Sequence, residues 1–162
     1  MIRRATLSDL DFLIHVARTQ YGAVFDEQIA RAWLKEALVN PQFLILRGER
    51  GGAVAALSHL FYEKQPRVHL LFIAALPGAG MVGEGMALVR EANAWRKQRG
   101  ASCLMFSSGT GIDLSPLAKR LKARVEAPSY VLNDGPVAPL QPMRSGASLL
   151  DQMLFSHMER AR

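Results

Sequence analysis

A glycine-rich junction between an apolar stretch and a helical pattern most constrains the fold of this chain. Residues 76–89 read LPGAGMVGEGMALV, and the preceding residues 68–76 are almost continuously apolar, which predicts a central strand buried on both faces. The residues after the junction repeat at helical spacing as far as Gly100, which predicts a helix with the inner-face residues Gly85, Leu88, Ala92 and Trp95. The junction is either a backbone surface for a phosphate-bearing ligand or a flexible loop.

Patterns elsewhere in the chain predict the remaining elements. Further strands are expected at residues 1–6, 42–49, 53–62, 102–108 and 130–133, with a hairpin turn at 50–52. Further helices are expected after Ser8 (with Asp11 as capping-box partner), from Asp26 to the Asn40–Pro41 stop, and at residues 116–124. The order predicts an α/β protein of the mixed α+β type, with a central mixed sheet of about six strands flanked by helices.

The first two helices have distinct predicted inner faces. For the first helix these are Leu10, Leu13, Ile14 and Ala17, and for the second Ile29, Ala30, Trp33 and Ala37. These faces are expected to pack against the sheet.

The composition changes after residue 133, so the main domain is expected to cover residues 1–133. Residues 134–146 are rich in Pro and Gly and predict an extended linker. Residues 147–162 predict an amphipathic C-terminal helix that starts with the capping box Ser148 and Asp151. This helix packs either on its own domain or on a partner, which is a second copy or another protein.

Composition and charge narrow the classes of function. Cys103 is the single cysteine, so no internal disulfide forms, and a reducing, cytoplasmic location is expected. The start resembles no signal peptide, and no uncharged run is long enough to span a bilayer, so no membrane contact is expected. The net charge of +6 suits an anionic ligand, yet the basic clusters lack the motifs of nucleic-acid binders, and no residues have metal-ligand spacing, so neither nucleic acid nor metal is expected.

The predicted element order and the junction together resemble the GCN5-related N-acetyltransferase (GNAT) superfamily. That family has Val-x-Pro, two residues, then Arg or Gln-x-x-Gly-x-Gly or Ala. This chain has Ala75-x-Pro77-x-x-Gly80-x-x-Gly83-x-Gly85. The resemblance covers roughly residues 1–133 and implies an acetyl-CoA co-substrate and an amine acceptor.

The resemblance implies a main-chain site for acetyl-CoA. A loop that leads into a helix leaves N–H groups free to hold a pyrophosphate. The residues implied in this role are Gly80, Met81, Val82, Gly83, Glu84, Gly85 and Met86, and those implied to pair with the pantetheine arm are Ile73, Ala74 and Ala75. Arg90 and the cluster Lys119, Arg120, Lys122 and Arg124 are further candidates for the nucleotide phosphate.

Three features depart from the family pattern. Gly80 stands where the family has Arg or Gln, and Glu84 places a carboxylate in the loop, where it either turns outward or repels the diphosphate. The usual Tyr that protonates the leaving thiolate is absent from the helix expected at residues 116–124.

No distinctive constellation marks the catalytic residues. His59, Glu63 and His69 are the candidate bases, and Ser107, Ser108 and Tyr130 are candidates to polarise or donate. His69 also fits a structural sheet histidine, and Glu63 also fits a surface charge. The acceptor entrance is expected to be lined by Tyr21, Phe25, Trp33 and Tyr62.

Three functions remain compatible with these features. The first is an acetyl-CoA-dependent N-acetyltransferase of unknown amine acceptor. The second is a catalytically inactive GNAT-like assembly protein that docks on a partner, or on a second copy, through residues 147–162. The third is a basic adaptor for nucleic acid, which the motifs disfavour.

Overall fold

The computed structural model describes residues 1–59, 61–106 and 119–123 of the chain. The chain divides into two compact units, Met1–Ser107 and Ser108–Arg162, and the first carries the fold described below. In the second unit, Lys119 and Arg120 are helical, as expected, but the helix predicted at 116–124 is wrong over residues 121–123, where the chain turns. The strand predicted at 130–133, the linker at 134–146 and the helix at 147–162 lie outside the described residues.

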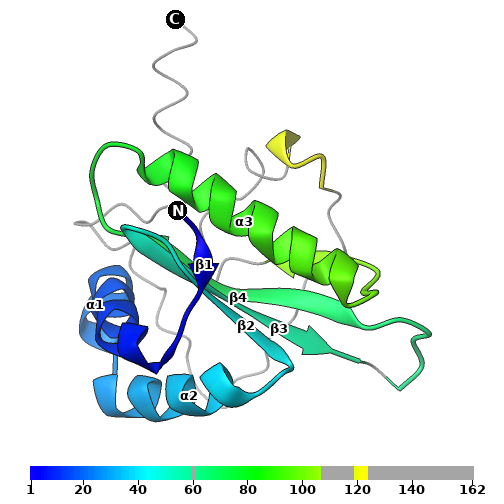
Figure 1. The fold of residues 1–162 in the computed structure, drawn as a ribbon, viewed down its shortest axis with the longest axis horizontal. Helices are drawn as coiled ribbons and strands as arrows, with labels where there is room; N and C mark the ends of the chain where they lie inside the picture. Colours follow the sequence, from blue (N-terminus) through cyan, green and yellow to red (C-terminus); the bar gives the residue numbers. More distant parts are fainter. Residues whose placement is uncertain (60, 107–118, 124–162) are drawn as a thin grey trace, which may run out of the picture. The chain divides into compact units, whose positions relative to one another are not determined.

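A mixed sheet forms the centre of the first unit (Figure 1). Its five described strands lie in the order β1 (Arg3–Arg4), β2 (Phe43–Arg47), β3 (Gly51–Ser58), β4 (Arg67–Ala75) and β5 (Leu104–Phe106). Neighbours from β1 to β4 are antiparallel, whereas β4 and β5 are parallel. The predicted mixed sheet is confirmed; the sixth expected strand falls outside the described residues.

Helices cover both faces of this sheet. Helices α1 (Leu10–Tyr21) and α2 (Glu27–Val39) pack on one face, and α3 (Met81–Gln98) crosses the other (Figure 1). Short 3-10 helices, Leu7–Asp9 and Gly22–Val24, flank α1. The core under α1 and α2 comprises Leu10, Leu13, Ile14, Leu34, Ala37, Ile45 and Val54. The core under α3 includes Leu88, Val89, Ala92 and Trp95.

The predicted face of the first helix is confirmed, and that of the second is wrong in part. Ile29 is 68% exposed and Trp33 is 40% exposed. Ala37 is buried and Ala30 packs against the core, as predicted, and Leu34, which the prediction left out, is buried as well. The face that packs therefore includes Ala30, Leu34 and Ala37 rather than Ile29 and Trp33. The helix begins after Asp26, as expected, and the Asp26 side chain caps it by accepting a hydrogen bond from the Ile29 N–H at 3.0 Å.

The hairpin turn between β2 and β3 is tighter than predicted. Gly51 and Gly52 were expected in the turn but begin β3, which ends at Ser58 rather than at residue 62. A Cβ at Gly51 would overlap the Ala74 carbonyl, and one at Gly52 would overlap Leu13. The two glycines therefore let β3 lie close against β4 and α1.

The first helix begins differently from the prediction. The capping box of Ser8 and Asp11 is wrong, because Thr6 and Asp9 form it two residues earlier. The buried Asp9 carboxylate accepts hydrogen bonds from Arg3 Nη1 and Nη2 at 2.7 and 2.6 Å and from the Thr6 N–H at 2.9 Å. The hydrogen bonds from Arg3 lower the pKa of Asp9 far below its usual value. This carboxylate thus ties β1 to the start of α1.

Asp9→Asn should lower the free energy of unfolding at pH 7 by about 2 kcal/mol, the usual cost of losing hydrogen bonds to a charged group. Because the folded state holds the pKa of Asp9 below its unfolded value, its stabilisation is complete above about pH 4 and is lost as the pH falls further. Urea unfolding should show the difference between wild type and variant shrinking below about pH 4. Asp11→Asn is the exposed control; a difference that stays constant down to low pH would contradict this account.

Candidate functional site

The junction between β4 and α3 needs glycine for its backbone shape. Gly78 has φ +136° and Gly80 has φ +84°, both in the region that side chains disfavour. Gly80 is the residue just before α3 begins at Met81. The absence of the Arg or Gln found in the GNAT pattern therefore has a local cause, since either residue would be strained here.

Two main-chain donors at the start of α3 are free within the described part of the chain. The Glu84 N–H donates to the Gly80 carbonyl at 2.9 Å, and the Met81 N–H reaches the Gly78 carbonyl at 3.4 Å. The N–H groups of Val82 and Gly83 have no backbone acceptor among the described residues. Gly85 and Met86 lie inside the helix, where each N–H bonds to the carbonyl four residues earlier.

The surface around these donors is open. Among the described residues, a Cβ built on Gly80 or Gly83 meets no atom within 4 Å. Met81 is 4% exposed and points into the core, so it offers main chain rather than side chain to the surface. Free donors at an uncrowded helix N-terminus are the kind of surface to which anionic groups bind in other proteins.

Glu84 turns away from this surface. Its Oε1 accepts hydrogen bonds from the Arg50 N–H at 2.9 Å and from the Gly51 N–H at 2.8 Å, both in the turn between β2 and β3. The carboxylate therefore does not occupy the position in front of Val82 and Gly83. The sequence left open whether Glu84 enters the loop, and the structure shows it engaged elsewhere.

Arg50 binds the same loop from the hairpin. Its guanidinium donates to the Pro77 carbonyl and lies against Gly78, where a Cβ would overlap it. Its main-chain carbonyl accepts the Leu76 N–H at 2.8 Å. Sequence reasoning missed Arg50, because it stands in an ordinary turn 26 residues before Leu76 and no local motif marks it.

One edge of β4 is open beside the junction. Within the described residues, β4 pairs with β5 only over Val68–Leu70, so Ile73, Ala74 and Ala75 have ladder partners only on the β3 side. The β3–β4 register shifts between Val54 and Ala55, which marks a β-bulge. This edge is where the GNAT resemblance places the pantetheine arm.

The structure brings some of the predicted catalytic candidates onto one sheet face. His69 pairs with Ala56 and Arg67 with Ser58, so by strand alternation His69, Arg67 and Ser58 share the face covered by α1 and α2. Glu63 was expected to fit a surface charge; instead its side chain is 13% exposed and paired with Arg67. His59 is exposed just after β3. Ser107, Ser108 and Tyr130 lie outside the described residues.

Two polar atoms on this face are buried without a hydrogen-bond partner among the described residues. They are Ser58 Oγ and Glu63 Oε2. Buried carboxylate oxygens usually accept a hydrogen bond. Glu63 Oε2 can therefore still accept one from a further donor.

The predicted aromatic entrance is assembled in part. Tyr21 lies 5.9 Å from the ring of Phe72 on β4, and burial raises the pKa of its phenol. Trp33 instead packs edge-on against Phe43 at 5.3 Å. Tyr62 pairs with Phe61, which is 98% exposed, beyond the end of β3.

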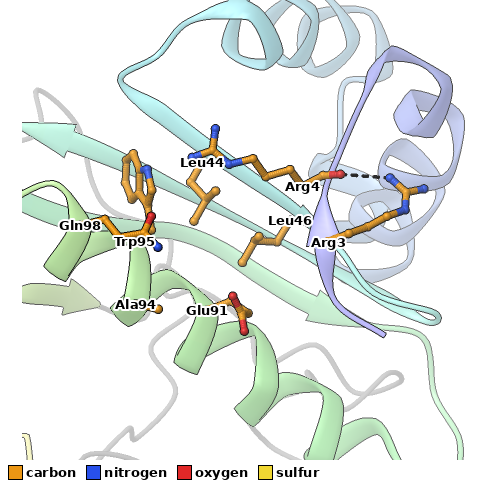
Figure 2. A pocket seen from close by; sticks show the side chains of 8 residues that line it. All are labelled: Arg3, Arg4, Leu44, Leu46, Glu91, Ala94, Trp95 and Gln98. Carbon is orange, nitrogen blue, oxygen red and sulfur yellow. Dashed lines mark hydrogen bonds between the residues drawn. The ribbon is translucent and has the colours of Figure 1, made fainter.

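A separate cavity of about 150 Å³ lies between the first two strands and the C-terminal half of α3 (Figure 2). Its lining residues are Arg3, Arg4, Leu44, Leu46, Glu91, Ala94, Trp95 and Gln98. It contains none of the junction residues and is smaller than the roughly 300 Å³ of typical ligand sites. We therefore do not place the functional site there.

In the part of the chain that the structure describes, no three His, Cys, Asp or Glu side chains form a group that could hold a metal ion. None of its helices combines the length and apolar character needed to cross a membrane.

Comparison with known proteins identifies the fold. No family model and no curated sequence matches the chain. The structure of AAC(6')-Iy with the bisubstrate analogue CoA-S-monomethyl-acetylneamine matches with a TM-score of 0.70 and 16% identity, over 84% of this chain and 98% of its own. The aminoglycoside 6'-N-acetyltransferase AAC(6')-IG from Acinetobacter haemolyticus matches with a TM-score of 0.67 and 17% identity, over 85% and 99%. The chain has the GNAT fold.

The GNAT fold does not by itself decide the activity. A transcriptional regulator from Bacillus halodurans matches as well, with a TM-score of 0.68 and 17% identity over 82% of this chain and 98% of its own. Function must therefore be argued from the residues of the site.

Gly83→Ala should change ligand binding at the backbone site without lowering the stability of α3. Because a Cβ there meets no described atom within 4 Å, the substitution should leave the unfolding free energy unchanged or raise it by up to about 1 kcal/mol. The same Cβ should weaken CoA binding at least about tenfold, because it crowds the free N–H groups. Calorimetric titration and urea unfolding measure the two effects.

The matched control is Gly100→Ala, at the far end of the same helix. Gly100 has φ +65°, so alanine should cost about 1 kcal/mol of stability while CoA affinity stays unchanged. Equal CoA affinity for Gly83→Ala and wild type would contradict the backbone site.

Proposed function

We propose that this chain is an N-acetyltransferase that transfers the acetyl group of acetyl-CoA to an amine. The observation that carries the proposal is the pair of N–H groups on Val82 and Gly83, which have no backbone acceptor and no crowding atoms among the described residues at the start of α3. An anion with several closely spaced oxygens, such as the diphosphate of CoA, fits donors of this kind. The turning of Glu84 toward the hairpin removes the repulsion that its sequence position suggested.

The open edge of β4 supports the same ligand. An amide-containing arm can pair, as an added strand does, with the edge of Ile73, Ala74 and Ala75 that faces away from β3 and has no ladder partner among the described residues. The junction and this edge are continuous in sequence, because β4 ends at Ala75 and α3 begins at Met81. One extended ligand can therefore contact both.

The chemistry needs few groups. The amine nitrogen attacks the thioester carbonyl carbon, the C–S bond breaks, and the CoA thiolate leaves and takes up a proton. A backbone N–H near the β4 edge stabilises the developing oxyanion. A base accepts the proton of the amine, and His69 is our candidate because it lies on β4, four residues before Ile73, on the face covered by α1 and α2.

The acceptor is proposed to be a cationic amine. Two of the matching structures bear the name aminoglycoside antibiotic 6'-N-acetyltransferase. On this chain the Glu63 carboxylate, with one oxygen unpaired among the described residues, provides a negative group on the face of His69. The Tyr21 and Phe72 rings add an apolar surface beside it.

Acetyl-CoA binding and turnover test the proposal. Acetyl-CoA at about 100 times its dissociation constant should stabilise the protein by about 2.7 kcal/mol and raise Tm by about 5 °C or more. Acetyl transfer should then be detectable with a panel of aminoglycosides and polyamines, by the release of CoA thiol. His69→Gln should retain the Tm shift and lose most of the turnover.

The outcomes separate the alternatives. A Tm shift without turnover on any amine would support a non-catalytic relative that retains the ligand site. No shift with millimolar acetyl-CoA would overturn the proposal.

A further inference from the structure

We propose that the turn between β2 and β3 is the second half of the diphosphate site, with Glu84 and Arg50 as positioning residues. This inference rests on the function proposed above and assigns a role to residues that the junction itself does not contain. The turn, residues 48–51, holds the Glu84 carboxylate through main-chain N–H groups and holds the loop before α3 through the Arg50 side chain. We call this arrangement the hairpin latch.

In the Glu84 half of the hairpin latch, two N–H groups donate to the same carboxylate oxygen. One oxygen, Oε1, accepts from Arg50 N–H at 2.9 Å and from Gly51 N–H at 2.8 Å. Hydrogen bonds to a carboxylate are about twice as strong as those between neutral groups. Because Glu84 lies in the first turn of α3, these bonds fix the start of the helix against the hairpin.

Gly48 shows how closely the hairpin and the helix approach. A Cβ at Gly48 would overlap the Glu84 carboxylate, and Gly48 is buried. The Gly48 N–H donates to the Gly51 carbonyl at 2.8 Å, which closes the turn. Glycine at this position therefore provides the space that the Glu84 carboxylate occupies.

The Arg50 half of the hairpin latch acts on the other side of the free donors. The guanidinium binds the Pro77 carbonyl, and the Arg50 carbonyl binds the Leu76 N–H at 2.8 Å. The segment that holds the free donors is thus tied to the hairpin at both ends, at residues 76–77 and at residue 84. Holding both ends keeps the Val82 and Gly83 N–H groups in one orientation before ligand arrives.

The hairpin latch explains two departures from the GNAT pattern together. The junction has no basic residue of its own at Gly80, and Arg50 brings a guanidinium to Gly78 instead. The junction has an added carboxylate, and the hairpin N–H groups bind that carboxylate. The same segment, residues 48–51, provides both the guanidinium and the N–H groups.

Substitutions at Glu84 separate positioning from charge. Glu84→Gln retains an acceptor oxygen and loses the charge, so CoA should bind as tightly as to wild type or up to about tenfold more tightly. Glu84→Ala loses the acceptor, so CoA should bind about tenfold more weakly. Glu91→Gln and Glu91→Ala, on the exposed side of the same helix, are the charge-matched controls and should leave the Kd unchanged. Calorimetric titration with CoA provides the measurement, and circular dichroism checks that each variant is folded.

Gly48→Ala tests the same contact from the hairpin. It should weaken CoA binding in the wild-type background, because the new Cβ displaces the Glu84 carboxylate. It should have no further effect in the Glu84→Ala background, where the overlap is gone. The single variant Gly48→Ala keeps the inference testable if Glu84→Ala fails to fold, and unchanged CoA binding by Gly48→Ala would contradict the hairpin latch.

The results distinguish the inference from the proposed function. Wild-type protein that binds no CoA would overturn both. Wild-type binding with tighter binding by both Glu84 variants would show a charge effect alone and overturn the hairpin latch. Unchanged binding by Glu84→Ala would also overturn it, while the acetyltransferase proposal would stand.

Discussion

The attachment of the start of α3 to the turn between β2 and β3 is the constraint on which the candidate site depends. A helix that begins immediately after a strand would present its first N–H groups in any case. Here the Glu84 carboxylate accepts two hydrogen bonds from the turn, and Arg50 binds the Pro77 carbonyl. The free donors of Val82 and Gly83 lie between these two attachments, so their direction is set by the hairpin as well as by the helix.

Under the proposed function, the site departs from the GNAT pattern at two residues, and residues of another element compensate for both. Gly80 replaces a cationic or amide side chain because the backbone there has φ +84°. The positive group comes instead from another element, and the extra carboxylate serves as a structural acceptor. A sequence motif covers only one segment of the chain. It therefore does not indicate residues such as Arg50, which lie elsewhere in the sequence and contact that segment in the fold.

Local patterns predicted most of the fold and only part of the site. The apolar run of β4, the helix that begins at Met81 and its end at Gly100 follow from periodicity and glycine position. The inner face of α2 was wrong in part, since Ile29 and Trp33 are exposed, and the capping box before α1 is formed by Thr6 and Asp9, whose carboxylate also pairs with Arg47 of β2. Such long-range contacts leave no local signal, and the engagement of Glu84 by the hairpin is another of the same kind.

The most direct test of the central claim follows the amide signals of Val82 and Gly83 by two-dimensional NMR during titration. CoA should shift both signals and saturate with a single affinity, because its diphosphate accepts hydrogen bonds from these N–H groups. Pantetheine, which lacks the diphosphate, should shift signals along Ile73–Ala75 and leave Val82 and Gly83 in place. Equal shifts of the two amides with both ligands, or none with CoA, would contradict the account.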